Sequence, residues 1–494
     1  MPHSSISPNT SAESSITATR GLSTLEARVK QDLEWLALPA KRWLLEQSDP
    51  QAKNVVIIGA GMAGLAVAFA LRLQGIDAVL YDKAPKDYEG PWATTARMET
   101  LRSPKHLTGP ALDIPSLTFR AWYEAQYGLE AWDALDKIPR LQWADYLRWY
   151  RQVLALDVHN DHTLTDLNVQ DPQRITLTFS HHGETHQVSA RKVILATGMD
   201  AFGGPSIPDF VADVQKRFWA HSEEAIDFAA LAGRRVAVVG GSATAMDVSA
   251  TALEAGAAGV ELLVRRPDFP RVNLSKGAGN PGLEAGYFAL PDEWKWRLAH
   301  HISTVQTPPP HGSTLRVSRH PNAWFNFNAP VERVETRGEG IVVHTPQGEV
   351  PVDFLILATG YTLNWHARPE FHALVDQVKT WGDAWQPPAD KQNAQLSSYP
   401  YLGADFAFQA KHADAPPALS RLHCFSHPAL LSNGHVVGLI PGISQGARTL
   451  AQNIAGQLYH EDREPYFQSI VHYDDPELLG DEWQPAVPYA WRER

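Results

Sequence analysis

The chain has 494 residues, of which 44% are hydrophobic and 20% are charged, a globular composition with room for two or three domains. The 43 Lys and Arg residues against 55 Asp and Glu residues give a net charge of -12, which disfavours binding to nucleic acid or to an anionic membrane. The single cysteine, Cys424, excludes an intrachain disulfide and a CxxC redox pair, and it fits the reducing cytoplasm, where we expect the protein.

Residues 1–22 are predicted to form a disordered tail. The first twenty residues are rich in Ser, Thr and Asn and lack the apolar stretch of a secretory signal. A helix is expected from Ser23, because Ser23 and Glu26 have the spacing of a capping box and an apolar stripe follows at helical spacing. This helix would pack on the outside of the first domain or on a partner chain.

Residues 53–85 are predicted to form a strand, a glycine turn, a helix and a second strand. Gly59 permits the tight turn of a GxGxxG motif, Gly61 lets the backbone approach a pyrophosphate, and Gly64 lets helix and strand pack closely. Asp82 ends the second strand, where a ribose-binding carboxylate belongs. The predicted contacts to this first dinucleotide are Gly59, Gly61, Met62, Ala63, Gly64, Asp82 and Lys83.

A second strand–turn–helix–strand unit spans residues 234–266. Here Ser242 replaces the middle glycine, and the second strand ends in two arginines instead of an acid. A missing acid disfavours a free ribose 2'-hydroxyl, and arginine suits a 2'-phosphate, so this unit predicts an NADPH site. Its predicted contacts are Gly240, Ser242, Ala243, Thr244, Arg265 and Arg266.

Two predicted strands end in the sequence Ala-Thr-Gly, at residues 196–198 and 358–360, and they bracket the second unit. Small residues at a strand end allow the backbone to approach a cofactor closely, so Thr197, Thr359 and Gly360 are further predicted contacts. The order of the motifs indicates one domain that is interrupted by another, which is inserted whole.

This order of motifs, ending in residues 358–361, resembles class B flavin-dependent monooxygenases, which include the flavin-containing and N-hydroxylating enzymes. The resemblance covers about residues 54–461. Gly90-Pro91-Trp92 stands where that group has Gly-x-Trp, and Ser103-Pro104-Lys105 resembles the polar turn that the group places near the flavin ring.

His221-Ser222 resembles the histidine of the group's fingerprint, but the remainder of the fingerprint differs. Gln215 and Arg217 stand where the group has Phe and Gly, and Ala225 stands where it has an aromatic residue. Assignment to one subgroup, Baeyer–Villiger enzymes above all, does not follow from these residues.

The resemblance implies FAD in the first unit, with Trp92, Ser103 and Lys105 among its contacts, and NADPH in the second. It implies that NADPH reduces FAD, that reduced FAD takes up O2 as a C4a-(hydro)peroxyflavin, and that one oxygen atom passes to a soft nucleophile, usually nitrogen or sulfur. Lys105 and His221 are the candidate catalytic residues. A flavin that carries the difficult chemistry needs no catalytic triad from the protein.

The predicted fold is therefore α/β, with two Rossmann-like dinucleotide-binding domains and the NADPH domain inserted into the FAD domain. The first segment of the FAD-binding domain is expected at residues 23–205 and the NADPH-binding domain at residues 206–325. The second segment of the FAD-binding domain, with a C-terminal extension, is expected at residues 326–494.

Four functions stay open. The first is oxygenation of a small nitrogen nucleophile, an amine or a hydroxylamine, and the second is hydroxylation of a heterocycle such as urate. The third is a pyridine-nucleotide reductase with a protein electron partner, and the fourth is a redox sensor without turnover. No metal is expected, since the adjacent pairs His181-His182 and His300-His301 lack the spacing of a shared site. We expect no nucleic-acid or membrane partner, and a homodimer stays open.

Overall fold

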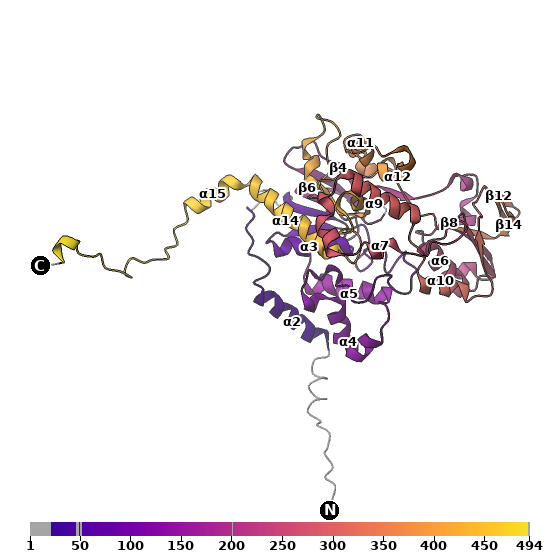
Figure 1. Ribbon diagram of the computed structural model, residues 1–494, viewed down its shortest axis with the longest axis horizontal. Coiled ribbons are helices and arrows are strands. Elements are labelled where there is room, and N and C mark those ends of the chain that lie inside the picture. Colours follow the sequence, from indigo (N-terminus) through magenta and orange to yellow (C-terminus); the bar gives the residue numbers. More distant parts are fainter. Residues whose placement is uncertain (1–20, 46–48, 50–51, 200, 493–494) are drawn as a thin grey trace, which may run out of the picture.

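The computed structural model describes residues 21–45, 49, 52–199 and 201–492. Figure 1 shows a larger α/β body around β6 and α3 and a smaller one around β8 and α10. The first twenty residues of the predicted tail lie outside the described residues. Among the residues that are described, no helix combines the length and the apolar character needed to cross a membrane.

The larger body is built on a seven-stranded sheet of order β3-β2-β1-β6-β5-β4, in which β17 also pairs with β6. Strands β1, β2, β3, β6 and β17 are parallel, whereas β4 and β5 add an antiparallel hairpin at one edge. The bounds are β1 Ala52–Ile58, β2 Ala78–Tyr81, β3 Val158–His159, β4 His162–Asn168, β5 Ile175–His181, β6 Glu184–Leu195 and β17 Leu422–Cys424.

The smaller body is built on a parallel five-stranded sheet of order β11-β10-β9-β15-β8. Strand β15 pairs with both β9 and β8, so the sheet continues well beyond the boundary expected at residues 325 and 326, which falls inside β11. That boundary therefore needs correction: the apolar run of β15 completes the second sheet. The bounds are β8 Trp219–His221, β9 Arg235–Val239, β10 Gly259–Val264, β11 Ala323–Phe327 and β15 Phe354–Leu357.

Two small antiparallel sheets complete the fold: the three-stranded one packs on the smaller sheet, and the two-stranded one lies on the connections between the bodies. Their strands are β12 Arg333–Arg337, β13 Gly340–Thr345 and β14 Gly348–Val352 in one, and β7 Gly203–Pro205 and β16 Tyr361–Leu363 in the other. The longer helices are α2 Leu22–Trp35, α3 Met62–Leu73, α4 Phe119–Ala134, α5 Arg140–Val153, α6 Ala243–Glu254, α9 Asp292–Val305, α10 His311–Ser318, α14 Ile443–Glu461 and α15 Arg463–Val471. Short helices are α7 Leu274–Gly277, α8 Pro281–Gly286, α11 Trp381–Ala384, α12 Ala394–Ser397 and α13 Leu430–Asn433.

Helix α2 begins one residue before the predicted start. Its N-cap is Gly21, and no side chain caps its first turn, so the capping box expected from Ser23 and Glu26 does not form. Gly21 has a φ of 139°, a conformation that glycine adopts without strain, and the chain enters the helix through this residue.

The helix that follows the first glycine turn is packed on nearly all sides. Most residues of α3 are buried, and α14 packs along it, which explains the continuous run of small and apolar residues in its sequence. A Cβ at Gly64 would lie 1.9 Å from the Gly59 carbonyl oxygen, so only glycine allows this approach of helix to strand.

The close packing at Gly64 predicts a large loss of stability for Gly64→Ala. The added methyl group must displace backbone atoms, so the free energy of unfolding should fall by about 1–3 kcal/mol or more. Gly456→Ala is the matched control, because Gly456 lies in α14 and its Cβ would meet nothing within 4 Å, so the free energy should rise by about 0.5–1 kcal/mol. Urea unfolding measures both values. Equal midpoints for the two variants would contradict the packing account.

Candidate active site

The first glycine turn joins β1 to α3 at the carboxyl edge of the larger sheet. Gly59 has a φ of 101°, and a Cβ there would lie 2.5 Å from the Ala196 carbonyl oxygen. Gly61 differs from its two neighbours in the motif: its φ of -68° suits any residue, and its Cβ would meet only backbone atoms of Gly90, the nearest at 3.7 Å. Two glycines therefore serve the fold, while Gly61 leaves space at the N-terminus of α3. This space suits a pyrophosphate, because no side chain caps that helix end.

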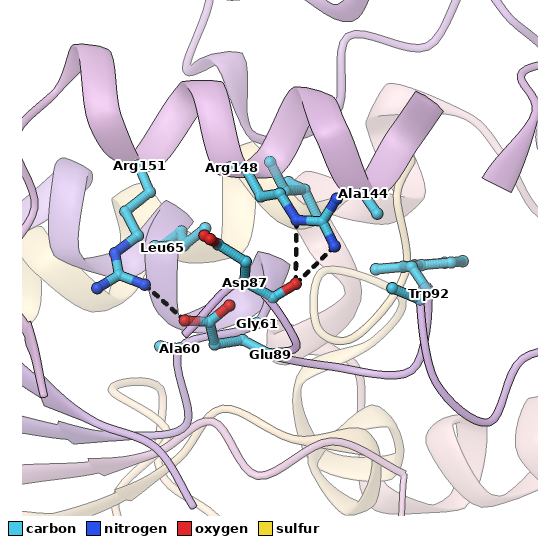
Figure 2. A pocket seen from close by; sticks show the side chains of 11 residues that line it. Ala60, Gly61, Leu65, Asp87, Glu89, Trp92, Ala144, Arg148 and Arg151 are labelled. Atoms are coloured by element: carbon cyan, nitrogen blue, oxygen red, sulfur yellow. Dashed lines mark hydrogen bonds and ion pairs between the residues drawn. The ribbon is translucent and has the colours of Figure 1, made fainter. Parts of the chain in front are cut away.

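A pocket lies against this space. Its lining includes Gly61, the loop that carries Asp87 and Trp92, and helix α5. Figure 2 shows Arg148 and Arg151 pointing from α5 toward the loop, where Arg148 donates to the Asp87 carbonyl oxygen and Arg151 pairs with Glu89. Arg148 also pairs with Asp145 at 2.6 Å, so both guanidinium groups hold the loop in place, and the helix N-terminus itself favours a bound anion. The sequence reasoning missed both arginines, although their three-residue spacing on one face of a predicted helix was a usable signal.

Asp82 lies at the end of β2, as predicted, and its carboxylate braces the glycine turn. One oxygen accepts from the Ala60 amide at 2.7 Å and the other from the Ala84 amide at 2.8 Å. Burial raises the pKa of Asp82, and the two amide donors oppose that rise. Each carboxylate oxygen keeps a lone pair for a ribose hydroxyl. Lys83, the next residue, is exposed, Met62 is buried and Ala63 is half-buried.

The second glycine turn repeats the geometry of the first. Gly240 has a φ of 138°, and a Cβ there would lie 2.6 Å from the Ala358 carbonyl oxygen. Ser242 is the N-cap of α6 but makes no capping hydrogen bond, so its hydroxyl and the first-turn amides of Ala243 and Thr244 are available to a phosphate. Both Ala-Thr-Gly sequences thus lie directly beside a glycine turn.

The two arginines that follow β10 have different surroundings. Arg266 donates to the carbonyl oxygens of Thr304 at 3.0 Å and Val305 at 3.3 Å, and so caps the C-terminus of α9. Arg265 is exposed, and none of the hydrogen bonds or ion pairs among the described residues uses its side chain. A second cavity, lined by Arg266, Phe269 and Arg271 among others, lies at this strand end.

The side chains of the two candidate catalytic residues are engaged by backbone groups. His221 ends β8; its Nε2 lies 3.1 Å from the Gly360 carbonyl oxygen, and its Nδ1 accepts from the Glu223 amide at 3.3 Å. Burial lowers the pKa of His221, which favours the neutral ring. The Lys105 ammonium donates to the carbonyl oxygens of Trp132 at 2.7 Å and Leu135 at 2.6 Å, at the C-terminal end of α4.

The remaining predicted contacts lie on the loops between the two units. The Thr197 amide donates to the Ser426 hydroxyl at 3.0 Å, and the Thr359 hydroxyl donates to the Ser206 carbonyl oxygen. Ser103 and Trp92 are half-buried in the connection from the first unit to α4. Arg102, beside Ser103, forms an ion pair with Asp247 of α6 at 3.2 Å, so this loop touches the second unit.

Two histidines that sequence reasoning missed lie beyond the end of β17. The His427 amide lies 3.5 Å from the Gly198 carbonyl oxygen, next to the first Ala-Thr-Gly, and the Tyr399 ring lies 6.3 Å from the imidazole. Burial, with a smaller contribution from nearby His435, lowers the pKa of His427 to about 4, and burial lowers that of His435. No sequence signal pointed to them, because β17 joins the first sheet from far along the chain.

The carboxyl ends of β2, β1, β6 and β17 follow one another across the larger sheet. A dinucleotide with its ribose at Asp82 and its pyrophosphate at Gly61 would extend in the direction of Thr197 and His427, as ligands do at the carboxyl edge of parallel sheets.

The sole cysteine, Cys424, ends β17; it is fully buried, and burial raises the pKa of its thiol to about 12.

Residues 53–373 match the family described as pyridine nucleotide-disulphide oxidoreductases. A FAD-dependent urate hydroxylase of Xanthomonas campestris pv. campestris is 38% identical over 473 residues, which cover 95% of this chain and 100% of the relative. An acetone monooxygenase of Gordonia sp. is 29% identical over 262 residues, which cover 50% of this chain and 44% of the relative.

Solved structures share the fold at low identity. The ornithine N-hydroxylase of Kutzneria sp. 744, with reduced FAD and NADP+, superposes with a TM-score of 0.63 at 16% identity, covering 82% of this chain and 99% of that one. The L-lysine 6-monooxygenase of Pseudomonas syringae gives a TM-score of 0.60 at 16% identity, covering 83% and 99%. The chain belongs to the pyridine nucleotide-disulphide oxidoreductase family, and over nearly its whole length it is related to a FAD-dependent hydroxylase.

Proposed function

We propose that this enzyme hydroxylates a heterocycle of the urate type, with NADPH as the electron donor and O2 as the oxygen donor. The observation that carries the proposal is the full-length similarity to the FAD-dependent urate hydroxylase, at 38% identity over 95% of the chain. One oxygen atom of O2 enters the product, the other leaves as water, and NADPH supplies the two electrons.

In this proposal the larger sheet holds FAD. The amides of Met62 and Ala63 and the open backbone at Gly61 receive the pyrophosphate, and Arg148 and Arg151 hold the neighbouring loop in place. Asp82 receives the ribose, as a carboxylate at this strand end does in dinucleotide-binding folds. The bound flavin would supply the redox chemistry and the reaction with oxygen.

The smaller sheet holds NADPH in the same proposal. Ser242, Ala243 and Thr244 meet the pyrophosphate, and the exposed guanidinium of Arg265 meets the 2'-phosphate. Arg266 supports the site indirectly, because it caps α9. His221 and Lys105 act as positioning residues, the first by fixing the turn at Gly360 and the second by fixing the end of α4.

The substrate end of the site is proposed near His427, His435 and Tyr399. With a pKa of about 4, His427 is neutral at physiological pH, and a neutral imidazole both donates and accepts hydrogen bonds. Such groups match the alternating N–H and C=O groups of a urate-type ring. An alkylammonium substrate, which the first of the four open functions includes, is better recognised by a carboxylate.

Turnover distinguishes the open functions. Under air, urate should accelerate NADPH oxidation, and labelled O2 should place one oxygen atom in the product. The amino acids ornithine and lysine should leave the rate at its basal value. An oxygenated amine in place of an oxygenated heterocycle would contradict the substrate assignment, and urate-independent oxidation of NADPH by a protein acceptor without O2 would support a reductase.

Gly61→Val should lose FAD and keep its fold. The residue has ordinary φ and ψ, and its Cβ makes only a van der Waals contact within the protein, so the branched side chain chiefly blocks the pyrophosphate. Gly204→Val is the control, since its Cβ would meet nothing within 4 Å. The flavin-to-protein absorbance ratio and circular dichroism report the result. A folded Gly61→Val protein with full flavin would contradict the assignment of this turn.

Arg265→Ala should raise the apparent KM for NADPH about tenfold, because a charge-assisted hydrogen bond contributes about 1.5–3 kcal/mol. The apparent KM for NADH should stay nearly unchanged. Arg266→Ala is the matched comparison: it removes the cap of α9 and should affect both nucleotides alike. Steady-state kinetics with each nucleotide give the values. Equal losses for both nucleotides in Arg265→Ala would assign that arginine to the fold.

A further inference from the structure

The C-terminal segment leaves the body of the protein as an arm, defined here as α15 and the following residues up to Arg492. Figure 1 shows it extending from the end of α14 away from both sheets. Pro476, Pro485 and Pro488 interrupt it, and each proline opposes helix formation. Beyond α15 the described part of the arm forms only one short helical turn, at residues 489–491.

The arm carries many large apolar side chains with no cover from its own chain. Each is more than half exposed, with values as high as 77% at Leu479 and 75% at Tyr489. Surface apolar residues are common singly, but a series along one segment marks a contact surface. The series consists of Phe467, Ile470, Val471, Tyr473, Leu478, Leu479, Trp483, Val487, Tyr489 and Trp491.

The base of the arm is fixed to the segment that follows α2. The Tyr466 hydroxyl donates to the Trp43 carbonyl oxygen at 3.1 Å, and the rings of these two residues lie 5.5 Å apart. Tyr459 of α14 stacks on Tyr466 at 5.1 Å and 3°. The arm therefore starts from a defined aromatic cluster on the segment that follows α2, and Figure 1 shows that it does not fold back over the two sheets.

A complementary surface lies at the end of α2. Trp35 and Leu36 there are 70% and 56% exposed. Lys30 and Lys41, near them in the sequence, are exposed, as is Glu34. The arm is acidic and has no lysine or arginine from residue 472 to residue 491. Its carboxylates, which would face those lysines, are Asp474, Asp475, Glu477, Asp481 and Glu482.

We propose that the arm docks on the α2 surface of a second copy of this chain, with Trp35 and Leu36 as the apolar contact and Lys30 and Lys41 as the charged one. Since each chain carries both the arm and its acceptor, a twofold axis lets two copies exchange arms reciprocally. Twenty extended residues reach about 65 Å, enough to cross to a neighbouring subunit.

The available area suits a stable dimer. An aromatic side chain buries about 150–250 Å². The five aromatic residues of the exposed series, about two-thirds exposed on average, therefore offer on the order of 600 Å² of surface per arm. Two arms and the surfaces that they cover then exceed the roughly 1,600 Å² of a standard interface, before any aliphatic residue is counted.

The first test is the mass of the FAD-loaded protein in solution, measured by light scattering or sedimentation at micromolar concentration. The full chain should have twice the single-chain mass of 54.6 kDa. A chain that stops after His472 should have the single-chain mass and unchanged flavin content, because the arm touches neither nucleotide turn. A monomeric full chain, or a truncated chain that is still dimeric, would overturn the proposal.

The second test addresses the acceptor surface. Trp35→Asp places a carboxylate where the acidic arm should dock, and it should yield monomers with full flavin content. Trp294→Asp is the control: Trp294 is a half-exposed aromatic residue of α9, and this variant should stay dimeric. If Trp35→Asp is as dimeric as Trp294→Asp while the truncated chain is monomeric, the arm binds elsewhere and the assignment to α2 fails.

Discussion

The architecture depends on one backbone contact that occurs twice. In each nucleotide unit the first glycine of the turn lies so close to the alanine of an Ala-Thr-Gly strand end that a Cβ would overlap a carbonyl oxygen, at 2.5 Å for Gly59 and 2.6 Å for Gly240. Both residues also have positive φ, a conformation that glycine adopts readily and that strains residues with a side chain. This contact sets the distance between each turn and the strand that leads to the other unit.

The connecting segments then determine how the two units face one another. Arg97 donates to the carbonyl oxygens of Ser222 at 3.3 Å and Glu224 at 2.8 Å, and Arg102 pairs with the buried carboxylate of Asp247. Arg316 of α10 donates to the Arg97 carbonyl oxygen at 3.2 Å. A chain of arginine contacts therefore ties the loop near Ser103 to the smaller body, and the two cofactors that the family uses can meet at this boundary.

Structural features that depend on a strict local geometry could be predicted from the sequence. The fold class is confirmed, and the paired turns, the Asp82 strand end and the inserted order of the two units lie where periodicity and glycine spacing indicated. The predictions that failed concerned features that depend on contacts between distant segments or on backbone conformation. The domain boundary predicted at residues 325 and 326 left β15 outside the second unit, because a short apolar strand does not reveal which sheet it joins. The N-cap of α2 is Gly21 and not Ser23, and no side-chain pattern indicates a cap of this kind. His427 lies beside the first Ala-Thr-Gly sequence only through the pairing of β17 with β6.

If two nucleotide turns built on one repeated contact hold NADPH and FAD, electrons pass directly from the first cofactor to the second. The most direct measurement is the visible absorbance of the bound flavin when NADPH is added without oxygen or substrate. We expect about one equivalent of NADPH to bleach the flavin, since each cofactor carries two electrons. Flavin that stays oxidised with excess NADPH, yet is bleached by dithionite, would contradict it.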